Sequence, residues 1–119
     1  MENKKITKIL VCGTNFGRIY LEGISQLPDT YKLVGIYSKG SAHSKACADN
    51  YNVPLYTDID KITPGDVDIV CVAIKSSITG GNGTLIALEF LRRGFNVIQE
   101  QPVHYEDVFK CYKTAMANN

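Results

Sequence analysis

The chain has 119 residues, of which 45% are hydrophobic and 21% charged, and 13 basic against 12 acidic residues give a formal net charge of +1. This length suits one domain, and the even charge balance without a basic run argues against nucleic acid as a partner. The longest apolar run, Ile69–Ile74, is too short to cross a bilayer and no signal peptide is recognisable, so we expect a cytoplasmic protein with no membrane contact.

The first predicted unit is a strand, a glycine turn and a helix. The apolar run Ile9–Cys12 predicts a strand covered on both faces, Gly13 permits a sharp turn after it, and Gly17 allows the helix to approach the strand closely. Asn15 can cap the helix, and Pro28 stops it. The apolar side chains of this helix recur at helical spacing and are Ile19, Tyr20, Ile24 and Leu27.

Strand and helix patterns then alternate to the end of the chain. The further predicted strands are Lys32–Tyr37, Val53–Tyr56, Val67–Ile74 and Phe95–Gln99. The further predicted helices are Ser41–Tyr51, a short turn near Asp58–Ile62, Thr84–Arg93 and Tyr105–Ala117. Strands separated by helices imply a parallel sheet. We therefore expect an α/β fold, a Rossmann-type doubly wound parallel sheet in three αβα layers, with ligands at the carboxyl ends of the strands.

Two of these helices have a predicted buried face. In the second helix, the residues that can share one face are Ala42, Ala46, Cys47 and Tyr51. In the helix Thr84–Arg93, the repeating apolar residues are Leu85, Leu88 and Leu91. Gly94 suits the position just past the end of that helix, where the backbone turns left-handed.

The four cysteines show no C-x-x-C spacing. Cys12 and Cys71 lie inside apolar strand runs, where a small buried thiol is the expected role. We therefore expect a reducing cytosol, no disulfide framework, and no zinc or other metal site.

The glycine turn is the first candidate binding site. A strand, a turn and a helix start present backbone N–H groups to a nucleotide pyrophosphate, and the candidate residues are Gly13, Thr14, Asn15, Phe16 and Gly17. A G-x-G-x-x-G pattern needs glycine at 13, 15 and 18, but this chain has Asn15 and Arg18. On this pattern alone, a nucleotide site and an ordinary strand-to-helix turn stay equally open.

The loop after the second strand bears on the choice of cofactor. An NAD site usually places a carboxylate there for the ribose 2′-hydroxyl, and none is present. Ser38, Lys39 and Ser41 suit a 2′-phosphate instead, so NADP(H) is favoured over NAD(H). The alternative is a solvated loop in which Ser41 only caps the next helix.

Polar residues also follow the fourth and fifth strands. Lys75 and Ser76 open a glycine-rich loop that either faces an anion or substrate or is a plain flexible connection. Glu100 and Gln101 precede Pro102, which can fix a turn that aims them at a bound ring. The alternative is a strand that simply ends at a proline, with Glu100 solvated and His104 on the surface.

Together these motifs resemble the N-terminal half of the Gfo/Idh/MocA oxidoreductase family. The resemblance lies in the strand–GTNFGR–helix unit, in VDIVCVAI and in a strand that ends Glu-x-Pro. Within the family, CGTNFGRIYLEGI, KSSITGGNGT and VIQEQPVH are similar to the thiazolinyl imine reductases of siderophore assembly lines. Most of the family carries a lysine where this chain has Gln101, and the imine reductases commonly lack that lysine.

The resemblance implies an NADPH-dependent reduction of a thiazoline C=N to a thiazolidine, on a substrate tethered to a carrier protein. It places the nicotinamide near Lys75–Ser77 and Glu100–Pro102, makes His104 a weak candidate for the proton donor, and implies a missing C-terminal domain. Residues 1–119 are then the cofactor domain, inactive alone, and apolar surface at the fifth strand could drive homo-oligomer formation. Two alternatives stay open: a stand-alone dinucleotide-binding module, and the cofactor domain of a sugar or polyol dehydrogenase.

Overall fold

The structure is a computed structural model that describes residues 5–13, 17–74, 82–99 and 105–118. The strands are β1 (Thr7–Cys12), β2 (Tyr31–Tyr37), β3 (Leu55–Tyr56), β4 (Ile69–Val72) and β5 (Val97–Gln99). The helices are α1 (Gly17–Ser25), α2 (Ala42–Tyr51), α3 (Asn82–Arg92) and α4 (Tyr105–Asn118). Two short 3-10 turns, Ile59–Lys61 and Pro64–Asp66, lie between β3 and β4.

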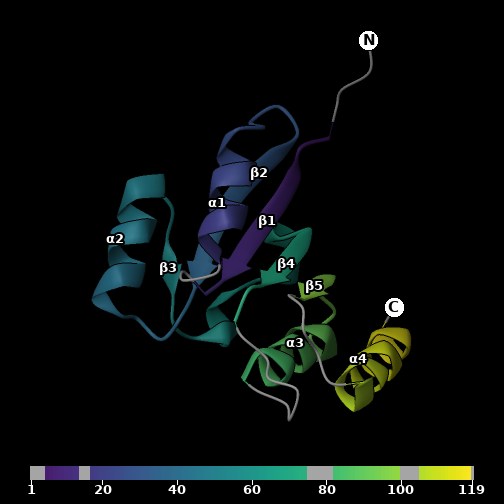
Figure 1. Cartoon of the computed structure of the whole chain (residues 1–119). Helices are drawn as coiled ribbons and strands as arrows, with labels where there is room; N and C mark the ends of the chain where they lie inside the picture. Colours follow the sequence, from purple (N-terminus) through teal and green to yellow (C-terminus); the bar gives the residue numbers. More distant parts are fainter. Residues whose placement is uncertain (1–4, 14–16, 75–81, 100–104, 119) are drawn as a thin grey trace.

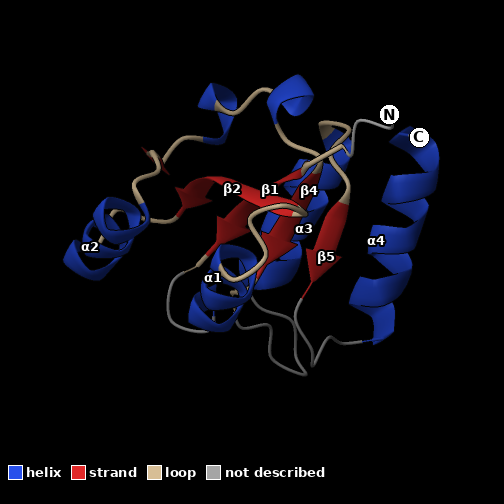
Figure 2. Cartoon of the chain, turned by 90° about the horizontal axis from the view of Figure 1, so that it is seen from above, coloured by secondary structure: helices blue, strands red, loops and turns tan. Residues whose placement is uncertain are grey.

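All five strands form one parallel sheet in the order β3-β2-β1-β4-β5. Helices α1 and α2 cover one face of the sheet and α3 covers the other, while α4 packs beside α3 and β5 (Figures 1 and 2). The predicted doubly wound parallel sheet in three layers is thus confirmed. In this order the chain leaves β1 toward β2 on one side and later returns to β4 on the other, so the order reverses at β1 and β4.

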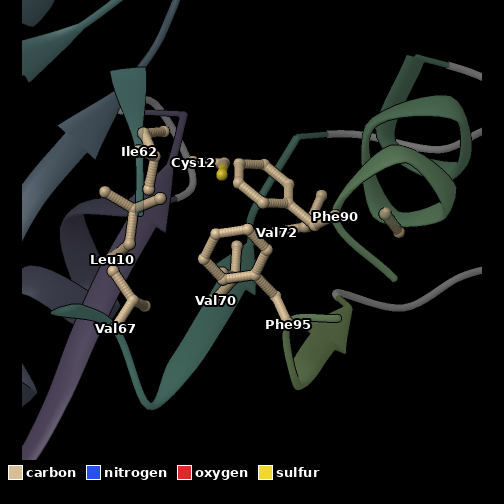
Figure 3. Packing of buried hydrophobic residues seen from close by; sticks show 9 residues of the cluster. Leu10, Cys12, Ile62, Val67, Val70, Val72, Phe90 and Phe95 are labelled. Carbon is tan, nitrogen blue, oxygen red and sulfur yellow. The ribbon is translucent and has the colours of Figure 1, made fainter. Parts of the chain in front are cut away.

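Two apolar clusters, one on each face, hold the layers together. On the α3 side, Phe90 and Phe95 pack edge to face with their ring centroids 5.2 Å apart, over Val70 and Val72 of β4 (Figure 3). On the other side, Leu21 of α1 is fully buried among strand residues. Each strand of the sheet's centre therefore buries residues on both faces, which explains its continuous apolar sequence.

The end of α3 is fixed as its glycine predicts. Gly94 has a φ of +87° and donates its N–H to the Leu91 carbonyl at 3.0 Å, and Phe95 donates to the Phe90 carbonyl at 3.1 Å. These two bonds and the Phe90–Phe95 contact form a Schellman motif. Because Gly94 and Phe95 belong to this helix end, β5 begins at Val97 and not at Phe95.

Several sequence-based boundaries were wrong by a few residues. β4 begins at Ile69 because Val67 donates its N–H to Pro64 and so closes a 3-10 turn. β4 ends at Val72, short of the predicted Ile74. β3 is limited to Leu55–Tyr56. Helix α1 ends at Ser25, and Leu27 beyond it is 52% exposed.

Two predicted helix faces were also wrong in part. In α2, the buried residues are Ser44 and Ala48, whereas Ala42 and Ala46 are exposed. The short side chains of Ser44 and Ala48 let α2 lie close to the sheet, and a search for large apolar residues overlooks them. In α3, Leu85 is 66% exposed, and Ala87 and Phe90 are buried with Leu88 and Leu91.

Candidate functional site

The candidate site lies at the carboxyl ends of β1, β2 and β4, where the strand order reverses. Because the sheet is parallel, these ends meet at one edge, which is the lower edge in Figure 1. The Gly13 N–H donates to the Tyr37 carbonyl at 3.0 Å, and the Ala73 N–H donates to the Cys12 carbonyl at 2.9 Å. The point of reversal is where open α/β sheets bind their ligands.

Gly13 has the conformation and the close contacts that the glycine turn requires. Its φ is +91°, a left-handed conformation that other residues adopt at a cost. A Cβ built at this position meets Ile74 Cγ1 at 2.9 Å and the Ala73 carbonyl oxygen at 3.1 Å. Gly13 therefore lies close against the residues that follow β4, and only glycine fits there without displacing its neighbours.

The loop after β2 is held by four hydrogen bonds. The Ser38 N–H donates to the Tyr56 carbonyl at 3.0 Å, and the Gly40 N–H donates to Ser38 Oγ at 3.0 Å. Ser41 is the N-cap of α2: its Oγ accepts from the Ser44 N–H at 3.1 Å and donates to Ser44 Oγ at 3.0 Å. These bonds tie the loop to β3 and to the first turn of α2.

These bonds give the loop's polar groups different roles. Ser41 Oγ already has two contacts, both with Ser44, so capping α2 is its role in this structure. Ser38 Oγ accepts from Gly40, and among the described residues no group accepts its hydroxyl proton, which can therefore be donated to an anion. Lys39 is exposed, and the ion pairs of the described residues do not include it. Ser38 and Lys39 are the loop's available donors.

Many of the predicted site residues lie outside the described residues. These are Thr14, Asn15, Phe16, Lys75, Ser76, Glu100, Gln101, Pro102 and His104. Gly17 is described as the first residue of α1, so the helix begins directly after the turn. The structure therefore joins Gly13 to Tyr37, the residue that directly precedes the loop 38–41.

Sequence reasoning missed the part that Tyr37 plays at this edge. Its carbonyl accepts the Gly13 N–H, and its ring packs against Phe90 with centroids 5.6 Å apart and planes 86° apart. Burial is the main cause that raises the pKa of the Tyr37 hydroxyl, with a smaller contribution from Cys12. The phenol is neutral near pH 7. No residue type signals a backbone acceptor, so the sequence could not have indicated this contact.

Two of the cysteines can be excluded as nucleophiles on physical grounds. Cys12 and Cys71 are buried as predicted, and burial raises the pKa of both thiols above the ordinary value. Their reactive thiolate form is therefore scarce near neutral pH. Within the described ranges, no three His, Cys, Asp or Glu side chains are grouped so as to hold a metal ion. Nor does any described helix combine the length and apolarity needed to span a membrane.

The described residues fit a dinucleotide. The left-handed Gly13 lies against Ala73 and Ile74 just past the end of β4, α1 begins at Gly17, and helix starts favour anions such as a pyrophosphate. Ser38 and Lys39 at the neighbouring strand end offer a hydroxyl donor and a positive charge to a second anionic group.

Comparisons with known proteins agree with this fit. A sequence profile of the oxidoreductase family Gfo/Idh/MocA, described as an NAD-binding Rossmann fold, matches residues 7–119. Among curated protein sequences, none matches the chain significantly.

Similar solved structures share the fold at low sequence identity. The WlbA dehydrogenase of Chromobacterium violaceum, in complex with NADH and UDP-GlcNAcA, has a TM-score of 0.83 and 20% identity over 99% of this chain and 34% of its own. GenD2 from gentamicin A biosynthesis, in complex with NAD, has a TM-score of 0.80 and 19% identity, over 96% of this chain and 32% of GenD2. KijD10, a 3-ketoreductase from Actinomadura kijaniata in complex with NADP and TDP-benzene, has a TM-score of 0.77 and 16% identity, over 96% of this chain and 35% of KijD10. The chain spans about a third of the length of these proteins.

Proposed function

Since the chain belongs to the Gfo/Idh/MocA oxidoreductase family, we propose that it is the cofactor-binding domain of an NADPH-dependent reductase. The observation that carries the proposal is the conformation of Gly13 at the end of β1. Its backbone is left-handed, and its N–H donates a hydrogen bond to β2, the strand that leads into the Ser38–Ser41 loop. Backbone groups of the turn Gly13–Gly17 bind the pyrophosphate, and Ser38 and Lys39 bind the 2′-phosphate. The bound cofactor supplies a hydride to the substrate.

The preference for NADPH rests on charge. The loop 38–41 holds Lys39 and no carboxylate, so it attracts a 2′-phosphate where an NAD site carries an acidic residue. The similar structures were solved with NADH, NAD or NADP, so the fold alone is compatible with either dinucleotide. The side chains of the loop are therefore the basis of the preference.

For the reaction, we propose reduction of a thiazoline C=N to a thiazolidine, on a substrate tethered to a carrier protein. This finer proposal rests on the resemblance of CGTNFGRIYLEGI, KSSITGGNGT and VIQEQPVH to the thiazolinyl imine reductases. Gln101 also supports it, because an amide cannot serve as the general acid or base that a lysine provides elsewhere in the family. In this proposal the substrate domain follows the chain and supplies the proton donor, with His104 as the weaker candidate.

The second candidate is the cofactor domain of a dehydrogenase acting on sugars. It is favoured by the similar structures, one of which contains UDP-GlcNAcA and another of which is a 3-ketoreductase. An assay of the protein that joins this domain to its substrate domain separates the two. We expect loss of NADPH absorbance with a thiazoline, and no gain of absorbance when NADP+ or NAD+ is mixed with a nucleotide sugar. A gain with a nucleotide sugar, or loss of NADPH absorbance with a keto sugar and none with the thiazoline, supports the sugar enzyme instead.

The cofactor assignment is tested by Lys39→Asp. We expect NADPH to bind at least about tenfold more weakly and NADH to gain relative to it, because a carboxylate repels the 2′-phosphate. Lys32→Asp is the matched control: it makes the same charge change on an exposed side chain near the amino end of β2, away from the loop. Both variants are titrated by calorimetry with each dinucleotide. An unchanged preference in Lys39→Asp contradicts the assignment of this loop.

A further inference from the structure

Tyr37 lies where the two parts of the candidate site meet. It pairs with Cys12 in the sheet, and its carbonyl accepts the Gly13 N–H of the glycine turn at 3.0 Å. The next residue, Ser38, begins the loop proposed for the 2′-phosphate and is held by Tyr56. A displacement of Tyr37 therefore changes the position of the turn and the loop relative to each other.

The ring of Tyr37 makes an aromatic contact with α3. Its ring meets Phe90 edge to face at 5.6 Å, and Phe90 in turn meets Phe95 edge to face at 5.2 Å. Phe90 is fully buried and Phe95 nearly so, in the cluster over β4 (Figure 3). Since protein cores are close-packed, Phe90 gives Tyr37 a rigid surface to rest on.

We propose that Tyr37 is a positioning residue for dinucleotide selectivity, whose ring, held by Phe90, sets the spacing between the Gly13 turn and the Ser38–Ser41 loop. This inference rests on the proposed function of the site. Both dinucleotides use the turn, but only NADPH carries the 2′-phosphate that the loop binds. Charge-assisted hydrogen bonds depend steeply on distance and angle, so a shifted loop weakens NADPH binding more than NADH binding.

The test compares three variants of the 119-residue chain by calorimetric titration with NADPH and with NADH. Tyr37→Leu removes the edge contact, and we expect the ratio of NADPH to NADH affinity to fall about tenfold. Tyr37→Phe keeps the ring, and we expect it to have the same ratio of NADPH to NADH affinity as the wild type. Phe95→Leu removes the other edge contact of Phe90, away from the loop, and lowers the melting temperature without changing the ratio.

The outcomes separate this inference from the proposed function. A wild-type chain that prefers NADPH, with the same ratio in Tyr37→Leu, overturns the inference alone. An equal fall in Phe95→Leu also overturns it, because general loss of packing then explains the effect. A wild-type chain that binds neither dinucleotide, or prefers NADH, overturns the proposed function together with the inference. Should Tyr37→Leu not fold, Tyr37→Met removes the same contact with a flexible side chain, and the same ratios decide.

Discussion

Replacing Gly13 by alanine tests how tightly the turn after β1 fits against β4. At a φ of +91° a side chain costs about 1–2 kcal/mol relative to glycine. The new Cβ also meets Ile74 Cγ1 at 2.9 Å and the Ala73 carbonyl oxygen at 3.1 Å, and such overpacking costs about 1–3 kcal/mol. Lower entropy of the unfolded alanine chain offsets roughly 0.4–1 kcal/mol of this. The net loss of unfolding free energy is about 1–5 kcal/mol.

Thermal unfolding followed by circular dichroism measures this loss. For a chain of this length, 1 kcal/mol corresponds to about 4 °C, so Gly13→Ala should lower the melting temperature by roughly 4–20 °C. Gly23→Ala is the control: Gly23 lies within α1 and a Cβ there meets no atom within 4 Å. It should raise the melting temperature by roughly 2–4 °C. If Gly13→Ala melts within about 2 °C of the wild type, the tight fit described for the turn is refuted.

Gly35 and Asp68 give two more predictions. Gly35→Ala should lower the melting temperature by roughly 4–8 °C, because a Cβ there lies 2.7 Å from Tyr56 Cε2. Gly65→Ala is its control and should change the melting temperature little, because a Cβ at Gly65 meets no atom within 4 Å. The Lys8 N–H, donating to Asp68 Oδ2 at 2.8 Å, is the main cause that lowers the pKa of this carboxyl. Asp68 thus stabilises the fold at pH values above the pKa that its carboxyl has in the unfolded chain. This stabilisation is lost as the pH falls through the lower pKa that the carboxyl has in the folded protein. Asp68→Asn should therefore be less stable than the wild type in denaturant titrations at pH 7, with the difference shrinking below pH 4; a constant difference contradicts the linkage.

Local patterns explain why much of the fold could be predicted. Apolar runs of strand length, separated by helical periodicity, are enough to indicate a parallel sheet with helices on both faces. Gly94 could be placed at the end of α3 because a left-handed helix end depends on one residue and its near neighbours. The turn at Gly13 could be located for the same reason.

Features that depend on distant contacts could not be predicted. The pairing of β1 with β2 shifts by one residue, so that Ile9 pairs with Leu33 but Leu10 pairs with Gly35. Gly35 is needed there because Tyr56, 21 positions along the chain, packs over it. Likewise, the carbonyl of Tyr37 reaches Gly13 only because β1 and β2 are neighbours. Hydrophobic periodicity carries no information about such pairings.

In the candidate site, the rule that parallel strands end at one edge correctly brought the glycine turn and the loop 38–41 together. The rule says nothing of which hydroxyls are already used. Ser41 matches a phosphate ligand by residue type, yet its Oγ contacts Ser44 twice as the cap of α2. Hydrogen bonds of this kind depend on rotamers and on burial of the partner, so they emerge only from the folded structure.

Calorimetric titration of the chain with NADPH and, separately, with NADH tests the central claim most directly. The turn at Gly13 and the donors Ser38 and Lys39 predict binding of both dinucleotides, with NADPH the tighter. Binding in which NADH is the tighter would contradict the assignment of the loop after β2. Failure to bind either dinucleotide would contradict the assignment of the Gly13 turn as a pyrophosphate site.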